Sequence, residues 1–166
     1  IGALARCINS GQSCVSAKRF LVERSAFSDF AQRFTRCLSA RKVGDPTDRS
    51  VQIGPLARKD LKDNLVRQVS QSVAAGAEVL FCGDVPKSPG FFYPVSAITN
   101  VTEEMPAYSE ELFGPAAILL PFDNEDHAVA LANDTDYGLG ASLWTSDRSR
   151  AKRLIPCINA GAVFIN

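Results

Sequence analysis

The feature that most constrains the fold is a run of seven apolar residues, AAILLPF, at positions 116–122. A run of this length without alternating polar residues is typical of a strand buried on both faces. The segments around it alternate between helical and strand-like patterns, which indicates a layered α/β domain. We therefore expect a mostly parallel sheet flanked by helices.

Shorter elements surround this run. The expected strands or extended segments are 19–23, 78–82, 91–101, 141–145 and 162–165. The expected helices are 28–41, 58–75, 124–134 and 147–158. Ser28, Asn124 (or Asp123) and Asp147 are suited to cap three of them, because their side-chain oxygens can accept free backbone N–H groups. Pro156 lacks an N–H group and should kink the last helix.

Length and charge limit the kind of protein. The 166 residues fit one domain, and 46% hydrophobic residues suffice for a packed core. The 18 basic residues balance the 18 acidic residues, so nothing favours nucleic acid or an anionic membrane as a partner. No apolar run approaches the ~20 residues that cross a bilayer. The chain starts without Met or a signal-peptide pattern and stops right after GAVFIN, so we expect part of a longer protein.

The five cysteines are odd in number and show no CxxC spacing. This argues against a disulfide framework and a cysteine-based zinc site, so we expect no metal site. Free thiols in a reducing compartment, the cytoplasm, are the simplest interpretation. Cys7, Cys37, Cys82 and Cys157 lie in apolar contexts, and we expect them to be core or partly buried.

The remaining cysteine, Cys14, follows Gly11, Gln12 and Ser13 in the stretch NSGQSCV. A nucleophilic thiol must be accessible and must ionise, which favours the end of a loop with backbone N–H groups nearby. A glycine three residues earlier allows a close backbone approach. A free cysteine is more often a small buried side chain, however, so local sequence leaves both interpretations open.

A second unusual stretch is EELFGP at 110–115, where two carboxylates precede Phe-Gly-Pro and a buried strand. A carboxylate can accept two hydrogen bonds from the vicinal hydroxyls of a sugar, and an aromatic ring can support a flat heterocycle. The alternative is a solvated acidic turn followed by a core Phe, and local sequence alone favours that alternative.

Together, GQSC at 11–14 and EELFGP at 110–115 resemble the active-site and cofactor segments of the aldehyde dehydrogenase superfamily. Further matches extend over the whole chain: RFLVE, KVGDP at 42–46, IGPLA at 53–57, ANDTDYGLGASLWTSD at 132–147 and GAVFIN at 161–166. AKRFLVE, GPLARKDLKDNLVRQV and FFYP look most similar to bacterial succinate-semialdehyde dehydrogenases. The resemblance implies that 1–166 is a catalytic domain that oxidises an aldehyde, with succinate semialdehyde as a candidate, to a carboxylic acid.

The resemblance also implies roles for three residues. Cys14 would attack the aldehyde carbon to form a thiohemiacetal, and its backbone N–H would stabilise the oxyanion. With NAD or NADP as the cofactor, Glu111 would bind the nicotinamide ribose and Phe113 would pack against the nicotinamide.

The family's dinucleotide-binding domain, oxyanion Asn, water-activating Glu and final oligomerisation segment have no counterpart in 1–166, which also has no GxGxxG loop. We therefore expect a partial chain that is inactive alone, whose partner is the missing domain and whose parent is a homo-oligomer.

Two positions depart from what many relatives carry. An Arg six residues before the nucleophile commonly holds the substrate carboxylate, whereas this chain has Ile8 there and Arg6 out of register. Some relatives have a second cysteine two residues after the nucleophile as a redox switch. This chain has Ser16 there, so we expect no such switch.

Other residues with functional side chains have ordinary structural interpretations. His127 could act as the base of a Cys-His hydrolase, but it falls in the solvated first turn of a helix. Lys18 and Arg19 flank a strand as structural or surface cations, and Trp144 is expected in the core. Asn166 ends the last strand and is a candidate for lining the substrate channel.

Two other functions remain open on the sequence. One is a thiol-dependent esterase or acyltransferase that uses Cys14 without redox chemistry. The other is a non-catalytic truncated module, in which Cys14 would be unreactive.

Overall fold

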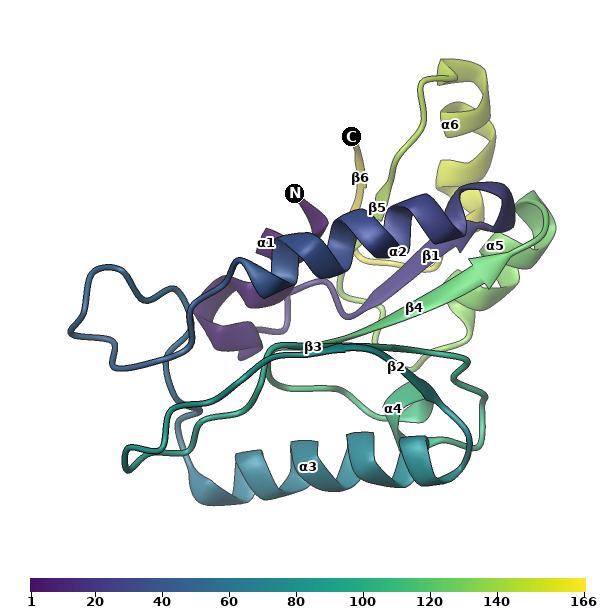
Figure 1. The fold of residues 1–166 in the computed structure, drawn as a ribbon. Coiled ribbons are helices and arrows are strands. Elements are labelled where there is room, and N and C mark those ends of the chain that lie inside the picture. Colours follow the sequence, from purple (N-terminus) through teal and green to yellow (C-terminus); the bar gives the residue numbers. More distant parts are fainter.

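The computed structural model describes residues 1–166 as a four-stranded sheet, a two-stranded sheet and helices (Figure 1). The strands are β1 (Arg19–Glu23), β2 (Glu78–Cys82), β3 (Ser96–Thr99), β4 (Ala116–Phe122), β5 (Ala141–Leu143) and β6 (Val163–Ile165). The helices are α1 (Gly2–Cys7), α2 (Arg24–Ser39), α3 (Lys59–Ala74), α4 (Pro106–Ser109), α5 (Glu125–Asn133) and α6 (Arg148–Leu154), with 3₁₀ turns at Ile8–Gly11 and Ile155–Cys157.

The larger sheet has the order β1-β4-β3-β2, and only the β2–β3 pairing is antiparallel. The smaller sheet pairs β5 with β6 in parallel. The expected mostly parallel sheet flanked by helices is confirmed. Sequence patterns did not indicate α1 or the single-turn helix α4, which are short.

Strand β4 divides the core into two layers. Ala116, Ile118 and Leu120 belong to one hydrophobic cluster, while Ala117 and Leu119 belong to the other. This division arises because successive side chains of a strand point to opposite faces. The first cluster packs under α3 and the second under α2, and Figure 1 shows these helices on opposite sides of the sheet.

Two helices start with the expected side-chain caps. The Asn124 side chain accepts the backbone N–H of His127 at 2.9 Å, and Asp147 caps α6. The expected last helix over 147–158 with a kink at Pro156 is wrong: α6 ends at Leu154 and a 3₁₀ turn at Ile155–Cys157 follows, because Pro156 lacks the N–H group that would continue the helix. No helix combines the length and the apolar character of a bilayer span.

The expected start of α2 at Ser28 is wrong. The helix begins at Arg24, directly after β1. Phe27 packs against the same cluster as Phe30 and Phe34, so an extra helical turn places another aromatic ring on the sheet.

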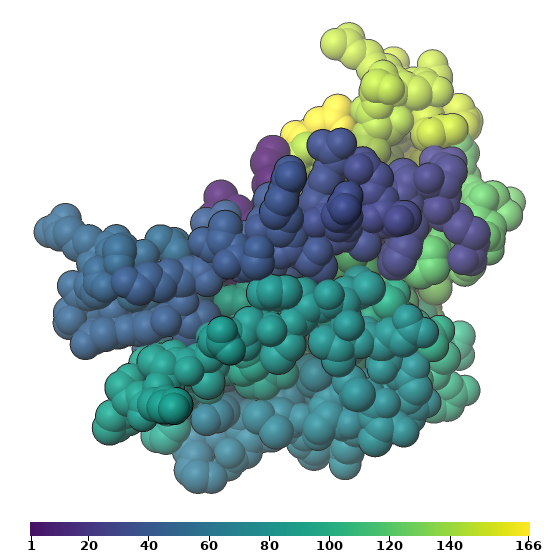
Figure 2. All heavy atoms as spheres, viewed as in Figure 1, coloured from purple at the N-terminus to yellow at the C-terminus, as the bar shows by residue number.

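The C-terminal unit, comprising β5, α6 and β6, projects from the rest of the molecule in yellow-green to yellow (Figure 2). Trp144 in this unit is 56% exposed, so its expected place in the core is wrong. The reason is that none of the residues of β5 or β6 is buried, so no second layer covers this part of the chain.

All five cysteines are free. Cys7 is buried, as expected. The expected burial is wrong for Cys37, Cys82 and Cys157, which are exposed on the outer side of α2, at the end of edge strand β2 and in the last 3₁₀ turn. Burial raises the pKa of the Cys7 thiol.

Candidate active site

The two motifs come together because they lead into neighbouring parallel strands. Cys14 precedes β1 and Glu111 precedes β4, and these strands pair in parallel. Segments that enter parallel neighbours reach the same edge of a sheet. A Cβ atom on Gly11 would lie 2.3 Å from the carbonyl carbon and oxygen of Gly114, so the GQSC loop and the EELFGP segment touch through their backbones.

The loop before Cys14 has an unusual backbone. Asn9, Ser10 and Gly11 have φ values of 51°, 55° and 75°. Left-handed residues in succession are unfavourable for side chains other than glycine, so the surrounding structure must hold them. Within the loop, the Asn9 amide group donates to the Gln12 carbonyl at 3.0 Å, and the Gln12 backbone N–H donates to the Asn9 carbonyl at 3.0 Å.

The IGPLA segment at 53–57 supports this loop from outside. The Gly54 backbone N–H donates to Ser10 Oγ at 3.0 Å, and the Ala57 N–H donates to Gln12 Oε1 at 2.8 Å. In the sequence, this segment is recognisable only through its resemblance to the family. In the structure, its backbone N–H groups donate hydrogen bonds to polar side chains of the loop.

Arg6 supports the loop from inside. Its side chain is fully buried and donates from Nη2 to the carbonyl oxygen of Gly11. Burial lowers the pKa of Arg6 to about 10. Arg6 is therefore not accessible to a substrate carboxylate, and Ile8, at the position discussed above, is 52% exposed. Nothing in the sequence between Arg6 and Gly11 indicates that the Arg6 side chain binds the Gly11 carbonyl.

Cys14 itself is exposed. Of the two interpretations that local sequence left open, the accessible loop thiol agrees with this position and the buried thiol does not. Ser16, the position where some relatives carry a second thiol, is buried, and its hydroxyl donates to the Ile8 carbonyl at 3.4 Å.

The adjacent carboxylates Glu110 and Glu111 face different partners. Glu110 Oε2 accepts from Gln68 Nε2 at 2.9 Å and from Arg67, both on α3. The Arg67 hydrogen bond is the main cause that lowers the pKa of Glu110. Glu111 instead reaches the Cys14 loop, where its Oε1 lies 2.9 Å from Lys18 Nζ. Glu110 therefore anchors the segment, and Glu111 remains available at the site.

Lys18 joins the two motifs and is the residue that sequence reasoning missed. Its ammonium group donates to the carbonyl oxygens of Ser13, Cys14 and Ser16 at 3.2–3.3 Å and pairs with Glu111. In the sequence, Lys18 stands beside Arg19 at a strand start, where a surface cation is the ordinary interpretation. Arg19 instead donates to the Asp134 carbonyl at 2.8 Å and stacks on Tyr108.

The other sequence candidates lie in different places. Phe113 is half-buried next to Glu111, while Leu112 between them is buried in the core. The Asn166 side chain bonds both backbone groups of Thr145, at 2.9 and 3.1 Å, and closes the β5–β6 sheet. His127 is in the first turn of α5, with its Nδ1 3.3 Å from Asp123 Oδ2.

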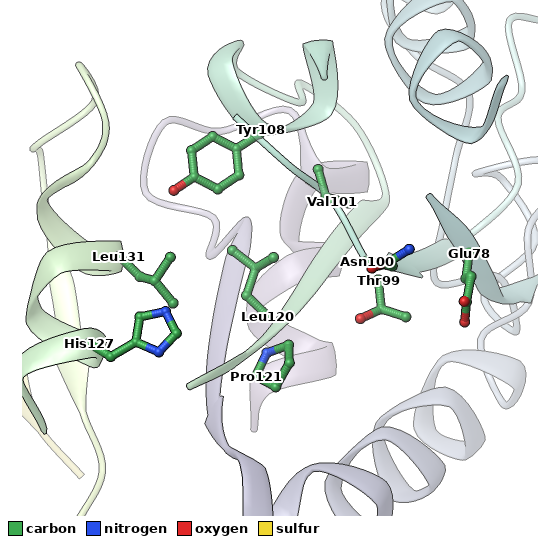
Figure 3. A pocket seen from close by; sticks show the side chains of 9 residues that line it. All are labelled: Glu78, Thr99, Asn100, Val101, Tyr108, Leu120, Pro121, His127 and Leu131. Atoms are coloured by element: carbon green, nitrogen blue, oxygen red, sulfur yellow. The ribbon is translucent and has the colours of Figure 1, made fainter. Parts of the chain in front are cut away.

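A cavity of about 360 Å³ lies elsewhere, at the ends of β3 and β4 (Figure 3). Its walls include Asn100, Tyr108, Pro121, His127 and Leu131. None of its lining residues belongs to the Cys14 loop or to EELFGP, which lie at the opposite ends of these strands. The candidate active site is therefore separate from this cavity, and its Cys14 is exposed.

Comparison with known proteins identifies the class to which this fold and this pair of motifs belong. The model of the aldehyde dehydrogenase family matches residues 3–166, and the chain belongs to that family. Among its relatives, a Synechocystis protein named "Probable succinate-semialdehyde dehydrogenase [NADP(+)]" is 47% identical over 162 residues, which cover 98% of this chain and 36% of the relative. The succinate-semialdehyde dehydrogenase [NADP(+)] of Mycobacterium avium is 45% identical over 163 residues, covering 98% and 34%.

Solved structures agree with this assignment. Succinic semialdehyde dehydrogenase from Streptococcus pyogenes, solved with NADP+ as the cofactor, superposes with a TM-score of 0.94 at 32% identity. The superposition covers 99% of this chain and 36% of that chain. The chain thus spans about a third of the length of the relatives it matches.

Proposed function

We propose that residues 1–166 are the thiol-bearing catalytic domain of an NAD(P)-dependent aldehyde dehydrogenase. The observation that carries this proposal is the contact between the Cys14 loop and the EELFGP segment, through Gly11 and Gly114 and through the Lys18–Glu111 ion pair. A thiol and a carboxylate that are far apart in sequence thereby face one open site. Because the chain spans about a third of its relatives, we propose that the family's dinucleotide-binding domain completes the site within a longer, homo-oligomeric enzyme.

In the proposed reaction, the Cys14 thiolate adds to the aldehyde carbon, and the carbonyl oxygen becomes the oxyanion of a thiohemiacetal. The Cys14 backbone N–H donates to that oxyanion, in the position where negative charge develops. Loss of hydride converts the adduct to a thioester on Sγ. Water then attacks the thioester, releasing the carboxylic acid and restoring the thiol.

The residues present fit the cofactor. When bound, the nicotinamide ring supplies the hydride acceptor. Lys18 holds one oxygen of Glu111, and the other oxygen has no partner within the chain and can accept a ribose hydroxyl. The half-buried ring of Phe113 offers an apolar surface next to it. The names of the relatives favour NADP over NAD for this site.

Succinate semialdehyde is the substrate that the relatives' names suggest. Its distal carboxylate needs a cation. Arg6 is buried beneath the loop, and Lys18 already has four acceptors. We therefore propose that the missing part of the longer enzyme supplies this cation. The five free thiols fit a reducing compartment, and we propose the cytoplasm.

The test is an assay of NADPH formation at 340 nm with succinate semialdehyde and NADP+. We expect turnover from the longer enzyme, a loss of more than about a thousandfold in the Cys14→Ala variant, and no turnover from the 166 residues alone. Normal turnover by the 166 residues would contradict the role of a missing domain. Normal turnover by Cys14→Ala would overturn the nucleophile.

The accessible position of Cys14 also permits redox-free thiol chemistry. An esterase would cleave p-nitrophenyl acetate without any nucleotide and lose this activity in Cys14→Ala. A non-catalytic module would show no preferential reaction of an alkylating reagent at Cys14 over the other exposed thiols. These two results separate the alternatives from the dehydrogenase.

A further inference from the structure

Lys18 lies between the nucleophile loop and the cofactor segment. Its side chain is 16% exposed, and Nζ lies 3.2 Å from the Ser13 oxygen, 3.3 Å from the Cys14 oxygen and 3.2 Å from the Ser16 oxygen. Glu111 Oε1 completes the set at 2.9 Å. An ammonium group has three N–H donors, so with four acceptors every N–H is used and at least one is shared between two acceptors.

Three carbonyl oxygens of one short loop converge on this ammonium group. Carbonyl dipoles that point at one place repel each other unless a cation lies between them, and hydrogen bonds to a charged donor are roughly twice as strong as neutral ones. The loop also follows three left-handed residues, Asn9 to Gly11. Lys18 therefore stabilises a backbone shape that is unfavourable by itself.

The same ammonium group fixes Glu111. Only Oε1 faces Lys18, and the Glu111 side chain remains 29% exposed. One oxygen is thus anchored toward the Cys14 loop, while the other has no partner within the chain. The charge next to the Cys14 backbone consequently depends on Glu111, because the carboxylate partly neutralises the ammonium group.

We propose that Lys18 is a positioning residue that couples Cys14 to Glu111, holding the loop in shape and setting the electrostatic potential at the thiol. A cation near a thiol favours the reactive thiolate, whereas an anion disfavours it. Lys18 therefore raises and Glu111 moderates the reactivity of Cys14. This inference deepens the proposed function, in which Cys14 is the nucleophile and Glu111 binds the cofactor.

The experiment measures alkylation of Cys14 by iodoacetamide in the native 166-residue chain, quantified for each cysteine by peptide mass spectrometry. We expect Lys18→Met to slow alkylation about three- to tenfold and Glu111→Gln to accelerate it about two- to fivefold, because the Lys18 ammonium group contacts the Cys14 carbonyl oxygen at 3.3 Å and pairs with Glu111 in a partly exposed site. Lys18→Arg keeps the charge and should restore most of the rate. The double variant should fall between the two single variants.

The other thiols provide internal controls. Exposed Cys37, Cys82 and Cys157 should react at unchanged rates in every variant, and buried Cys7 reports unfolding by becoming reactive. If Lys18→Met unfolds by this criterion, Glu111→Gln and Lys18→Arg still decide the question. Unchanged Cys14 rates, or changes of the same sign in Lys18→Met and Glu111→Gln, would overturn the coupling.

The outcome is independent of the proposed function, because no cofactor or aldehyde enters the labelling reaction. Opposite effects at Cys14 together with no aldehyde oxidation by the longer enzyme would retain the coupling and remove the dehydrogenase. Aldehyde oxidation together with equal Cys14 alkylation rates in all variants would retain the dehydrogenase and reject the coupling.

Discussion

The two sheets of this molecule differ in how they are covered. In the four-stranded sheet, β4 has five consecutive buried residues between the layers formed by α2 and α3. In the two-stranded sheet, no residue of β5 or β6 is buried, and Phe164 is 61% exposed. Both sheets are built from short apolar strands. The strand sequences alone therefore do not determine whether helices pack over a sheet.

This difference explains where the candidate site lies. Both of its motifs lead into strands of the covered sheet, whose register is fixed because a slip by one residue would expose the buried face. A two-stranded sheet alone is marginally stable in water. Polar contacts tie the β5–β6 unit to α5: the Asn133 side chain donates to the Cys157 carbonyl and accepts the Asn159 N–H, both at 2.8 Å, and Arg153 pairs with Glu125 at 3.0 Å. The residues of the candidate site are therefore positioned by the covered sheet, whereas the β5–β6 sheet leaves apolar side chains exposed.

The largest effect should come from the covered sheet. Leu119, in the middle of β4, has 0% exposure. We expect Leu119→Ala to lower the free energy of unfolding by about 3 kcal/mol, because it removes buried contacts and leaves a cavity. Phe164→Ala, a larger truncation in β6, should change it by less than about 0.5 kcal/mol. Equal losses in urea unfolding curves would show that the two sheets do not differ in this way.

The contact between the two motifs should come next. Gly11→Ala combines a positive φ with a Cβ that would lie 2.3 Å from backbone atoms of Gly114. We expect a loss of about 2 to 3 kcal/mol from strain and displacement of the loop. Gly76→Ala is the matched control, since it also has a positive φ but nothing within 4 Å of the added Cβ. It should cost about 1 kcal/mol, and equal costs would argue against a tight contact at Gly11.

Local patterns predicted much of the fold and part of the site. The bounds of β1, β2 and β4 follow their apolar runs, and the caps of α5 and α6 follow from Asn124 and Asp147. These features depend on neighbours in the sequence. Exposed Trp144 could not be predicted, because its strand pattern is apolar whether or not another layer covers it.

At the candidate site, too, the sequence does not show which groups contact each other in the folded chain. GQSC and EELFGP were recognisable as motifs, but the roles of Lys18 and Arg6 were not. Each depends on acceptors that only the folded loop brings together: three carbonyl oxygens for Lys18 and the Gly11 oxygen for Arg6. Every residue has a backbone carbonyl, so residue types do not show which carbonyls a side chain will bind. Lys18 and Arg6 therefore look like surface cations in the sequence.

The hydrogen bond between α4 and the end of α5, from which the chain continues to β5, should have a smaller effect. The Tyr108 hydroxyl donates to Asp134 Oδ2 at 2.5 Å. We expect Tyr108→Phe to cost about 1 kcal/mol, the usual value of one such hydrogen bond. Hydrogen exchange should increase in residues 134–166 and remain unchanged in β4. Equal changes in both regions would mean that Tyr108 stabilises the whole domain rather than residues 134–166.

The same hydroxyl predicts a pH dependence. Burial, and then the hydrogen bond to Asp134, raise the pKa of Tyr108 to about 12, and burial raises that of Tyr93 to about 12 as well. A raised pKa favours the protonated form in the folded state, so this contribution is complete below pH ~10 and is lost as the pH rises toward 12. Thermal unfolding should therefore show declining stability across this interval, with a smaller decline in Tyr108→Phe. An equal decline in Tyr108→Phe would contradict the assignment to Tyr108.

The smallest effect on stability should come from the exposed face of β5–β6. Phe164 pairs with Ser142 in the small sheet, and Trp144 directly follows β5; the two rings are 61% and 56% exposed. Exposed apolar surface of this kind favours association. We expect Trp144→Ser with Phe164→Ser to change stability by less than about 0.5 kcal/mol yet to lower the average mass in light scattering at high concentration. Val66→Ser removes a single exposed side chain, 45% exposed on α3, and should leave that mass unchanged. A monomeric wild-type chain at high concentration would contradict the prediction, because the exposed face would then not be sufficient for self-association.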